Sequence, residues 1–172
     1  MSEIIKVVSK QRNSKMCMIC GLDNEYGVRA PFYNMEDGSV MTLFQYREQH
    51  QSYPGRVHGG LITAMLDEMG LRAVWAKEGG KEDIWGVTMS LETKYRKPVP
   101  YNTTLIGKGV VTKFTPRFFV THASIMDLEG NVLADGDINY LHLDPKVIAS
   151  GAVMHEEMPY LIEDGVTEIS FK

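Results

Sequence analysis

Residues 50–74 read HQSYPGRVHGGLITAMLDEMGLRAV, and the rest of the chain is organised around this stretch. It begins as a polar loop with a Pro-Gly turn, passes through His58, Gly59 and Gly60, and then becomes a helix. A glycine pair at a helix start leaves backbone N–H groups able to meet a negative or polarised oxygen. Asp67 lies inside the apolar helix, where a carboxylate is costly unless it has a partner or a function. The stretch therefore predicts an active site.

The helix is predicted from residue 61 to about residue 77, because apolar residues recur there at helical spacing. They are Leu61, Ile62, Met65, Leu66, Met69, Ala73 and Val74. The opposite stripe carries small residues, and Asp67 falls on it, so we expect the helix to be buried and Asp67 to face a tight space. Gly79 and Gly80 follow and end the helix, since glycine suits the left-handed turn after a helix.

The composition indicates one globular domain. Hydrophobic residues make up 44% of the 172 residues and charged residues 23%, which allows a core without disulfides or metals. The formal net charge of -4 argues against non-specific binding to nucleic acid. Residues 1–15 lack a secretory signal pattern, and no stretch approaches the roughly 20 apolar residues of a membrane span. With only two cysteines, these features predict a cytoplasmic protein without membrane or nucleic-acid partners.

The remaining elements are mostly strands. Residues 26–46 predict a hairpin, and residues 84–95, 103–114, 118–126 and 131–142 predict four strands joined by short turns, which makes neighbours antiparallel. Residues 1–15 predict a helix or a frayed segment, and the tail ends in a possible strand at 167–171. The predicted fold class is α+β, with a mostly antiparallel sheet around one helix. One domain spans 1–172, with an N-terminal extension (1–25), a core (26–143) and a tail (144–172).

Cys17 and Cys20 have the spacing of half a zinc site. No second pair follows, and a redox pair would be expected after a strand at the start of a helix. We interpret the two as small buried thiols in a packed loop and predict no metal. A metal shared across a subunit interface, or redox chemistry, remains an alternative.

Three motifs carry a resemblance to a known family. They are His58-Gly59-Gly60 with Asp67, Cys17-x-x-Cys20-Gly21 with Asn24 and Gly27, and Tyr95-x-x-Pro98-x-Pro100. Over residues 16–143 the chain resembles the hotdog-fold acyl-CoA thioesterases of the phenylacetate-degradation (PaaI-like) type. The resemblance implies a long helix wrapped by a curved antiparallel sheet. It also implies homodimers or homotetramers with sites at subunit interfaces, and coenzyme A as part of the substrate rather than as a cofactor.

The resemblance implies a hydrolysis that these residues could perform. Water attacking a thioester carbonyl makes an oxyanion, which the Gly59 and Gly60 amides would hold while His58 binds the same carbonyl. Asp67 would be the general base or, alternatively, a nucleophile. Burial should raise the pKa of Asp67, and a nearby donor would lower it again. By similarity, the hydroxyl of Thr88 would help to position the water.

Further residues are predicted to contact the substrate. Gln51 and Ser52 occupy a loop where some relatives carry Asn, and Glu68 is interpreted as a salt-bridge partner or a second acid of the site. Flexible methionine suits an acyl pocket, and cations near strand ends could meet coenzyme A phosphates. These residues are Met89, Arg96, Lys97 and Arg117.

Two other functions remain open from the residues. A non-catalytic, regulatory hotdog protein would bind acyl-CoA without turnover. A hydratase or dehydratase on the same fold would pair a histidine with an acid, for which His58 and Asp67 are available. A repressor is disfavoured because no DNA-binding segment is visible.

Overall fold

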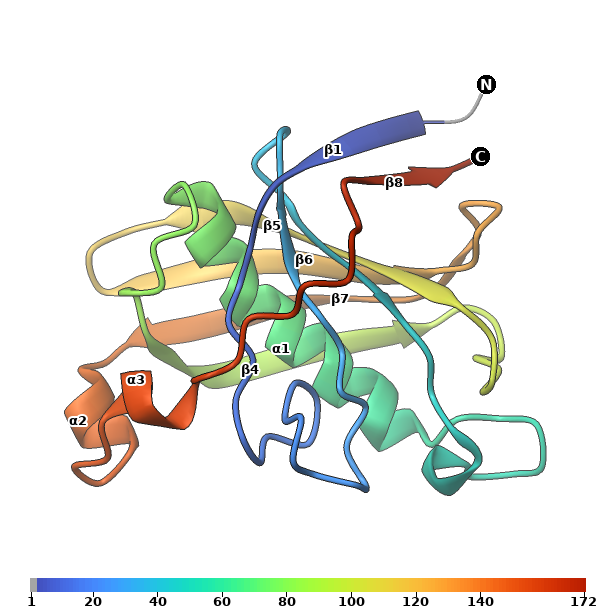
Figure 1. The fold of residues 1–172 in the computed structure, drawn as a ribbon, viewed down its shortest axis with the longest axis horizontal. Helices are drawn as coiled ribbons and strands as arrows, with labels where there is room; N and C mark the ends of the chain where they lie inside the picture. Colours follow the sequence, from blue (N-terminus) through green and yellow to red (C-terminus); the bar gives the residue numbers. More distant parts are fainter. Residues whose placement is uncertain (1–2) are drawn as a thin grey trace.

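The computed structural model describes residues 3–172, which form one long helix packed on an eight-stranded antiparallel sheet (Figure 1). The sheet order is β4-β7-β6-β5-β3-β2-β1-β8. The strands are β1 (Glu3–Lys10), β2 (Tyr33–Met35), β3 (Val40–Phe44), β4 (Gly86–Tyr95), β5 (Leu105–Phe114), β6 (Phe118–Met126), β7 (Val132–His142) and β8 (Glu168–Phe171). The helices are α1 (Gly59–Lys77), α2 (Pro145–Ile148), α3 (Met154–Glu157) and the 3-10 turn η1 (Glu48–His50). The predicted α+β class and antiparallel sheet are confirmed.

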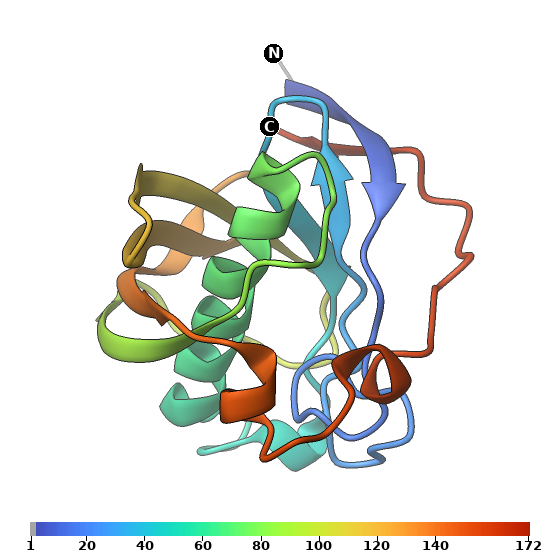
Figure 2. The ribbon, with the colours of Figure 1, turned by 90° about the vertical axis from the view of Figure 1, so that its left-hand side faces the viewer.

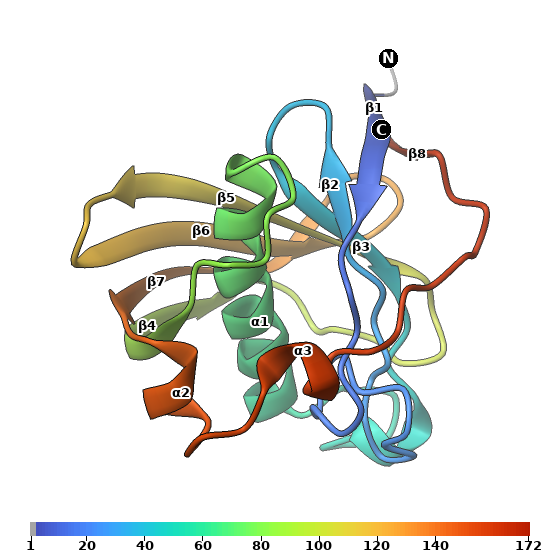
Figure 3. The ribbon, with the colours of Figure 1, turned by 60° about the vertical axis from the view of Figure 1, so that its left-hand side comes forward.

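Helix α1 lies across the concave side of the sheet and packs against β5, β6 and β7 (Figure 3). Met65, Leu66 and Met69 are fully buried there. The approach is close because β5 carries glycine at 107 and 109. A Cβ on Gly109 would lie 2.8 Å from the Met69 carbonyl oxygen. This contact fixes the height of α1, and therefore of Asp67, above the sheet.

The expectation of a helix or frayed segment at residues 1–15 is wrong for 3–10, which form β1. Ile4, Ile5, Val7 and Val8 are β-branched and favour a strand. The partners of β1 are β2 and β8, which come from distant parts of the chain, so local sequence did not reveal them. Met1 and Ser2 lie outside the described residues.

The tail runs along the outside of the molecule from α2 and α3 to β8, which pairs with β1 (Figure 2). On the way, Asn13 and Tyr160 form an antiparallel bridge. The possible last strand predicted at 167–171 is therefore present. No helix within residues 3–172 is long and apolar enough to cross a bilayer.

Strand β4 forms one edge of the sheet. It pairs with β7, and no other strand of residues 3–172 pairs with its outer side. The register shifts between Thr88 and Ser90, which makes Met89 the extra residue of a β-bulge. Met89 is 54% exposed at this open edge. The open edge of β4 lies beside one face of α1. We call the boundary between these two elements the α1/β4 seam.

Candidate active site

Asp67 faces the α1/β4 seam and is held there by hydroxyls from two strands. Thr88 on β4 donates to its Oδ1 at 2.7 Å. The Tyr140 hydroxyl on β7 donates to the Asp67 carbonyl oxygen at 2.5 Å and lies 3.2 Å from Oδ1. Oδ2 accepts no hydrogen bond from residues 3–172 and stays open. One carboxylate oxygen is thus fixed and the other is available.

The sequence placed Asp67 deep among apolar neighbours, but the side chain is only half-buried because the seam follows the open sheet edge. Burial raises the pKa of the Asp67 carboxyl, the Thr88 and Tyr140 hydrogen bonds lower it in part, and neighbouring Glu68 raises it again. The pKa of Asp67 therefore lies above its ordinary value. A raised pKa makes the carboxylate a stronger base at neutral pH.

Thr88 and Tyr140 meet Asp67 together because they are directly opposite each other in the β4–β7 register. Thr88 was predicted from the sequence as a site residue, but Tyr140 was not. Tyr140 stacks on Phe119 at 4.7 Å between ring centroids, which orients its hydroxyl toward the helix. The strand 131–142 was predicted, but its register against β4 depends on the bulge at Met89, for which the sequence carries no clear signal.

The start of α1 presents one open amide. His58 is the N-cap, and its Nδ1 accepts from the Gly60 N–H at 3.0 Å. An Nδ1 that accepts leaves the ring proton on Nε2, which can donate outward from the exposed side chain. The Gly59 N–H donates to no atom of residues 3–172. Of the two amides expected to hold an oxyanion, only Gly59 is free in this arrangement.

A cavity of about 380 Å³ opens beside this helix start. Its lining includes Gly59, Ile62, Tyr95, Arg96 and Lys97. The Tyr95 hydroxyl binds the Gly59 carbonyl at 3.0 Å and so joins the end of β4 to the start of α1. A Cβ at Gly59 would lie 3.3 Å from that hydroxyl, so glycine at this position allows Tyr95 to approach the helix start closely.

Asp67 and the Gly59 amide are far apart in one chain. A helix rises about 1.5 Å per residue, so eight residues place them roughly 12 Å apart along α1. A donor to a reacting carbonyl lies about 3 Å from its oxygen, and the attacking water lies about 3–3.5 Å from the carbon. The two groups of one chain therefore do not reach the same thioester carbonyl.

Comparison with known proteins agrees with this fold. The profile of the Thioesterase superfamily matches residues 54–134. A solved structure from the thioesterase superfamily is 30% identical, covers 59% of this chain and 75% of its own, and gives a TM-score of 0.51. The chain belongs to the thioesterase superfamily. A second thioesterase superfamily structure is 26% identical, with 73% of this chain and 63% of that chain covered and a TM-score of 0.64.

Among curated proteins, the chain is similar to acyl-coenzyme A thioesterase THEM4 of Mus musculus. The two are 29% identical over 73% of this chain and 51% of that protein. The chain thus spans about half the length of the curated relatives it matches. The predicted resemblance to hotdog-fold thioesterases is confirmed at the level of the superfamily.

Within this thioesterase superfamily fold, the predicted substrate residues separate into groups. Arg96 and Lys97 line the cavity, but Arg96 also pairs with Asp135, with Nη2–Oδ2 at 3.0 Å. Met89 lies on the open edge beside Thr88. Arg117 lies in the β5–β6 turn, where its carbonyl accepts from the His142 N–H, close to the Gly86 end of β4. One chain therefore does not bring Arg117 to the cavity at the opposite, Tyr95 end.

The remaining three predicted residues do not contact Asp67's open oxygen. Gln51 and Ser52 are exposed in the loop before α1, where Gln51 Oε1 accepts from the Tyr101 hydroxyl at 3.4 Å. Glu68 turns away from the seam, and its Oε1 binds Arg72 Nε at 2.7 Å. The salt-bridge interpretation of Glu68 therefore describes its observed geometry.

Proposed function

We propose that this chain is an acyl-CoA thioesterase that hydrolyses a thioester to a free acid and coenzyme A. The observation that carries the proposal is the half-buried Asp67, with Oδ1 fixed by Thr88 and Tyr140 and Oδ2 open. Membership of the thioesterase superfamily and similarity to a protein named acyl-coenzyme A thioesterase support the substrate class. Coenzyme A enters only as part of the substrate.

In the proposed step, Asp67 Oδ2 takes a proton from a water molecule as that water attacks the thioester carbonyl carbon. The carbonyl oxygen becomes an oxyanion, which the Gly59 N–H holds at the positive end of α1, with His58 Nε2–H as a second donor. The tetrahedral intermediate then collapses and expels the coenzyme A sulfur, which takes up the proton held by Asp67, so that free coenzyme A leaves and the carboxylate is restored. The hydroxyls on Oδ1 keep Oδ2 directed toward the water.

The site is proposed to use two chains. Thr88 contacts Asp67 near the start of β4, and Tyr95 contacts Gly59 at its end. If two copies pair their open β4 edges antiparallel, the start of one β4 lies beside the end of the other. Asp67 of one copy then faces Gly59 of the partner subunit, which removes the 12 Å separation.

The same pairing would also bring Arg117 close to a cavity, although Arg117 lies far from the cavity of its own chain. The turn holding Arg117 lies near the Gly86 end of β4, so it would approach the partner's cavity, where Arg96 and Lys97 lie. Cations from both copies would then surround one pocket, as binding of coenzyme A phosphates requires. The proposed oligomer is therefore a homodimer, or a tetramer built from such dimers.

Mixing of two inactive variants tests the proposal. Asp67→Asn removes the base, and Gly59→Pro removes the amide donor at the first helical position, which accepts proline. Each variant alone should lose about 100- to 1,000-fold in kcat for its best acyl-CoA thioester. Refolded together, they should recover about a quarter of wild-type activity, because half of the dimers then hold one intact site.

Gly59→Ala is the matched control, because it keeps the N–H and adds only a methyl group near Tyr95. A mixture no more active than its parents would place both groups in one chain and reject the two-chain site. Full activity of Asp67→Asn would reject Asp67 as the base. Binding of acyl-CoA without thiol release would favour the regulatory alternative, and hydration of an enoyl-CoA would favour a hydratase.

A further inference from the structure

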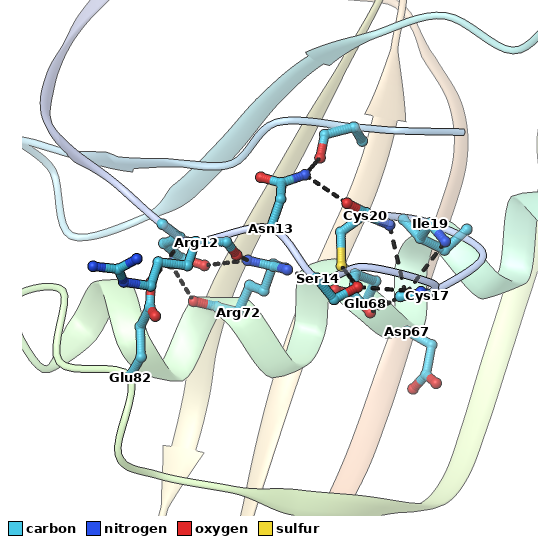
Figure 4. Close-up of polar contacts among 12 residues, drawn as sticks. Arg12, Asn13, Ser14, Cys17, Ile19, Cys20, Asp67, Glu68, Arg72 and Glu82 are labelled. Atoms are coloured by element: carbon cyan, nitrogen blue, oxygen red, sulfur yellow. Dashed lines mark hydrogen bonds and ion pairs between the residues drawn. The ribbon is translucent and has the colours of Figure 1, made fainter. Parts of the chain in front are cut away.

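A second cluster of chemically reactive side chains lies on the other side of α1 from the Asp67 carboxylate (Figure 4). Cys17 and Cys20 come from the loop between β1 and β2, and Glu68 comes from α1. One ligand atom from each lies within 4.8 Å of the other two. The sequence contained only half of a metal site, and the fold brings the third ligand from the helix.

We propose that Cys17 Sγ, Cys20 Sγ and Glu68 Oε2 bind a zinc ion, with a solvent molecule as the fourth ligand. Zinc binds thiolates at about 2.3 Å and carboxylates at about 2.0–2.2 Å, so tetrahedral ligand atoms lie roughly 3.5–3.8 Å apart. Cys17 Sγ and Glu68 Oε2 are 3.7 Å apart. Two thiolates also favour zinc over magnesium or calcium, which prefer oxygen ligands.

The loop is shaped to present the sulfur atoms. The backbone N–H groups of Ile19 and Cys20 donate to Cys17 Sγ at 3.3 and 3.5 Å, an arrangement that suits a thiolate. The turn is tight because residue 21 is glycine. A Cβ there would lie 2.4 Å from the Cys17 carbonyl oxygen. Cys17, Cys20 and Gly21 thus form one unit that directs two sulfurs toward α1.

Arg72 holds the third ligand in position. Its Nε binds Glu68 Oε1 at 2.7 Å, which leaves Oε2 directed at Cys17. The Arg72 side chain is fully buried, and its Nη1 is held by Gln11 Oε1 at 3.2 Å and the Arg12 carbonyl at 3.0 Å. Outer partners of this kind orient metal ligands.

The charges of the cluster suit a divalent cation. Metal binding displaces the thiol protons of both cysteines, and the two thiolates and one carboxylate then outnumber the single guanidinium by two negative charges, which one zinc ion neutralises. Cys20 is buried, whereas Cys17 and Glu68 are partly exposed and leave a path for the ion. The bound metal would tie the loop of residues 14–21 to α1, one residue from Asp67.

Metal binding is tested on the reduced wild-type chain, without any activity assay. Zinc titration should saturate at one ion per chain, and cobalt should give the intense near-ultraviolet absorption of thiolate-to-cobalt charge transfer. Cys17→Ser and Cys20→Ser should abolish that absorption. Glu68→Gln should weaken zinc at least as much as the roughly 10–100-fold loss seen when an outer partner is removed.

Glu82→Gln is the matched control, because Glu82 is a nearby acid that binds the Arg12 N–H rather than the sulfur atoms. It should bind zinc like the wild type. Circular dichroism should verify that each variant is folded. The cobalt spectrum of the wild-type chain tests the site even if a variant does not fold. Substoichiometric zinc, a cobalt spectrum without thiolate absorption, or equal losses in Glu82→Gln and Glu68→Gln would overturn the site. So would a reduced chain that takes up no zinc but forms a Cys17–Cys20 disulfide with a low-molecular-weight disulfide.

Discussion

Two hydroxyls on one oxygen give Asp67 its asymmetry. Thr88 and Tyr140 approach Oδ1 from neighbouring strands, while Oδ2 faces the open side of the seam. Rotation of the carboxylate would break the Thr88 hydrogen bond and take Oδ1 away from the Tyr140 hydroxyl, which also donates to the Asp67 carbonyl oxygen. In the proposed mechanism, the direction in which Asp67 would accept a proton is therefore set by β4 and β7, and not by the helix that carries Asp67.

The Thr88 hydroxyl can be removed with little change in shape. Thr88→Val should lower kcat by about 10- to 100-fold, since a hydrogen bond to a charged group is worth about 1.5–3 kcal/mol. Thr88→Ser keeps the hydroxyl and should stay near wild type. Steady-state kcat and KM on one acyl-CoA thioester measure both. Equal rates for the two variants would show that the hydroxyl has no positioning role.

Gly70 gives the Tyr140 hydroxyl its space. Replacing glycine inside a helix by alanine usually stabilises by about 1 kcal/mol. Here a Cβ would lie 2.3 Å from the Tyr140 hydroxyl and 2.6 Å from Thr121 Oγ1, so Gly70→Ala should instead destabilise by about 1–3 kcal/mol. Urea unfolding measures the loss.

A double variant identifies the cause of that loss. Tyr140→Phe removes the hydroxyl nearest to the added methyl group, so Gly70→Ala should be less damaging in Tyr140→Phe than in the wild type. Additive losses would mean that the Tyr140 hydroxyl does not create the crowding.

At the scale of elements, α1 was the most predictable part of the fold. Its apolar spacing predicted a helix from residue 61 to about 77, and the structure places it at Gly59–Lys77. The four later strands were also predicted, because their β-rich runs are separated by turn residues. Pairings between distant segments were not predictable: β1 with β8, and Glu68 with the Cys17 loop, depend on contacts across the fold rather than on local patterns.

The contact of α1 with β5 depends on glycine. Gly109→Ala should destabilise the chain by about 1–3 kcal/mol, because the added Cβ meets helix backbone, which cannot rotate away as a side chain would. Thermal unfolding should then begin about 2–4 °C lower for each kcal/mol lost. Lys113→Ala, at an exposed position of the same strand, is the control and should change stability by less than about 0.5 kcal/mol. A Gly109→Ala variant as stable as this control would contradict the close packing.

At the scale of the whole molecule, the tail is fastened to the first strands by Asp164. The Lys10 ammonium pairs with Asp164 Oδ1, and the Tyr33 hydroxyl donates to Oδ2 at 2.6 Å. Burial raises the pKa of Asp164, but the hydrogen bonds from Lys10, Tyr33 and the Val166 N–H outweigh it. The pKa of Asp164 in the folded chain therefore lies below its ordinary value.

A lowered carboxyl pKa makes this attachment sensitive to acid. The stabilisation is complete above the unfolded pKa of about 4 and is lost as the pH falls through the lower folded pKa. Asp164→Asn should reduce the free energy of unfolding at pH 7 by up to about 1 kcal/mol, as expected for an exposed pair. Urea unfolding from pH 7 to pH 3 should show this difference shrinking. Glu163→Gln, an exposed neighbour, is the control, and a difference independent of pH would contradict the assignment.

The pairing of β1 with β8 affects the order in which parts of the sheet fold and open. Ile5 lies opposite Ile169, so this pair closes a loop that contains nearly all of the described chain. Closing so long a loop is slow, and local opening at such an edge is easier than opening of central strands. Backbone amides of β8 should therefore exchange with deuterated water well before those of β6. The half of the sheet that contacts Asp67 through Thr88 and Tyr140 can then finish folding before β8 joins, and can keep its shape when β8 opens.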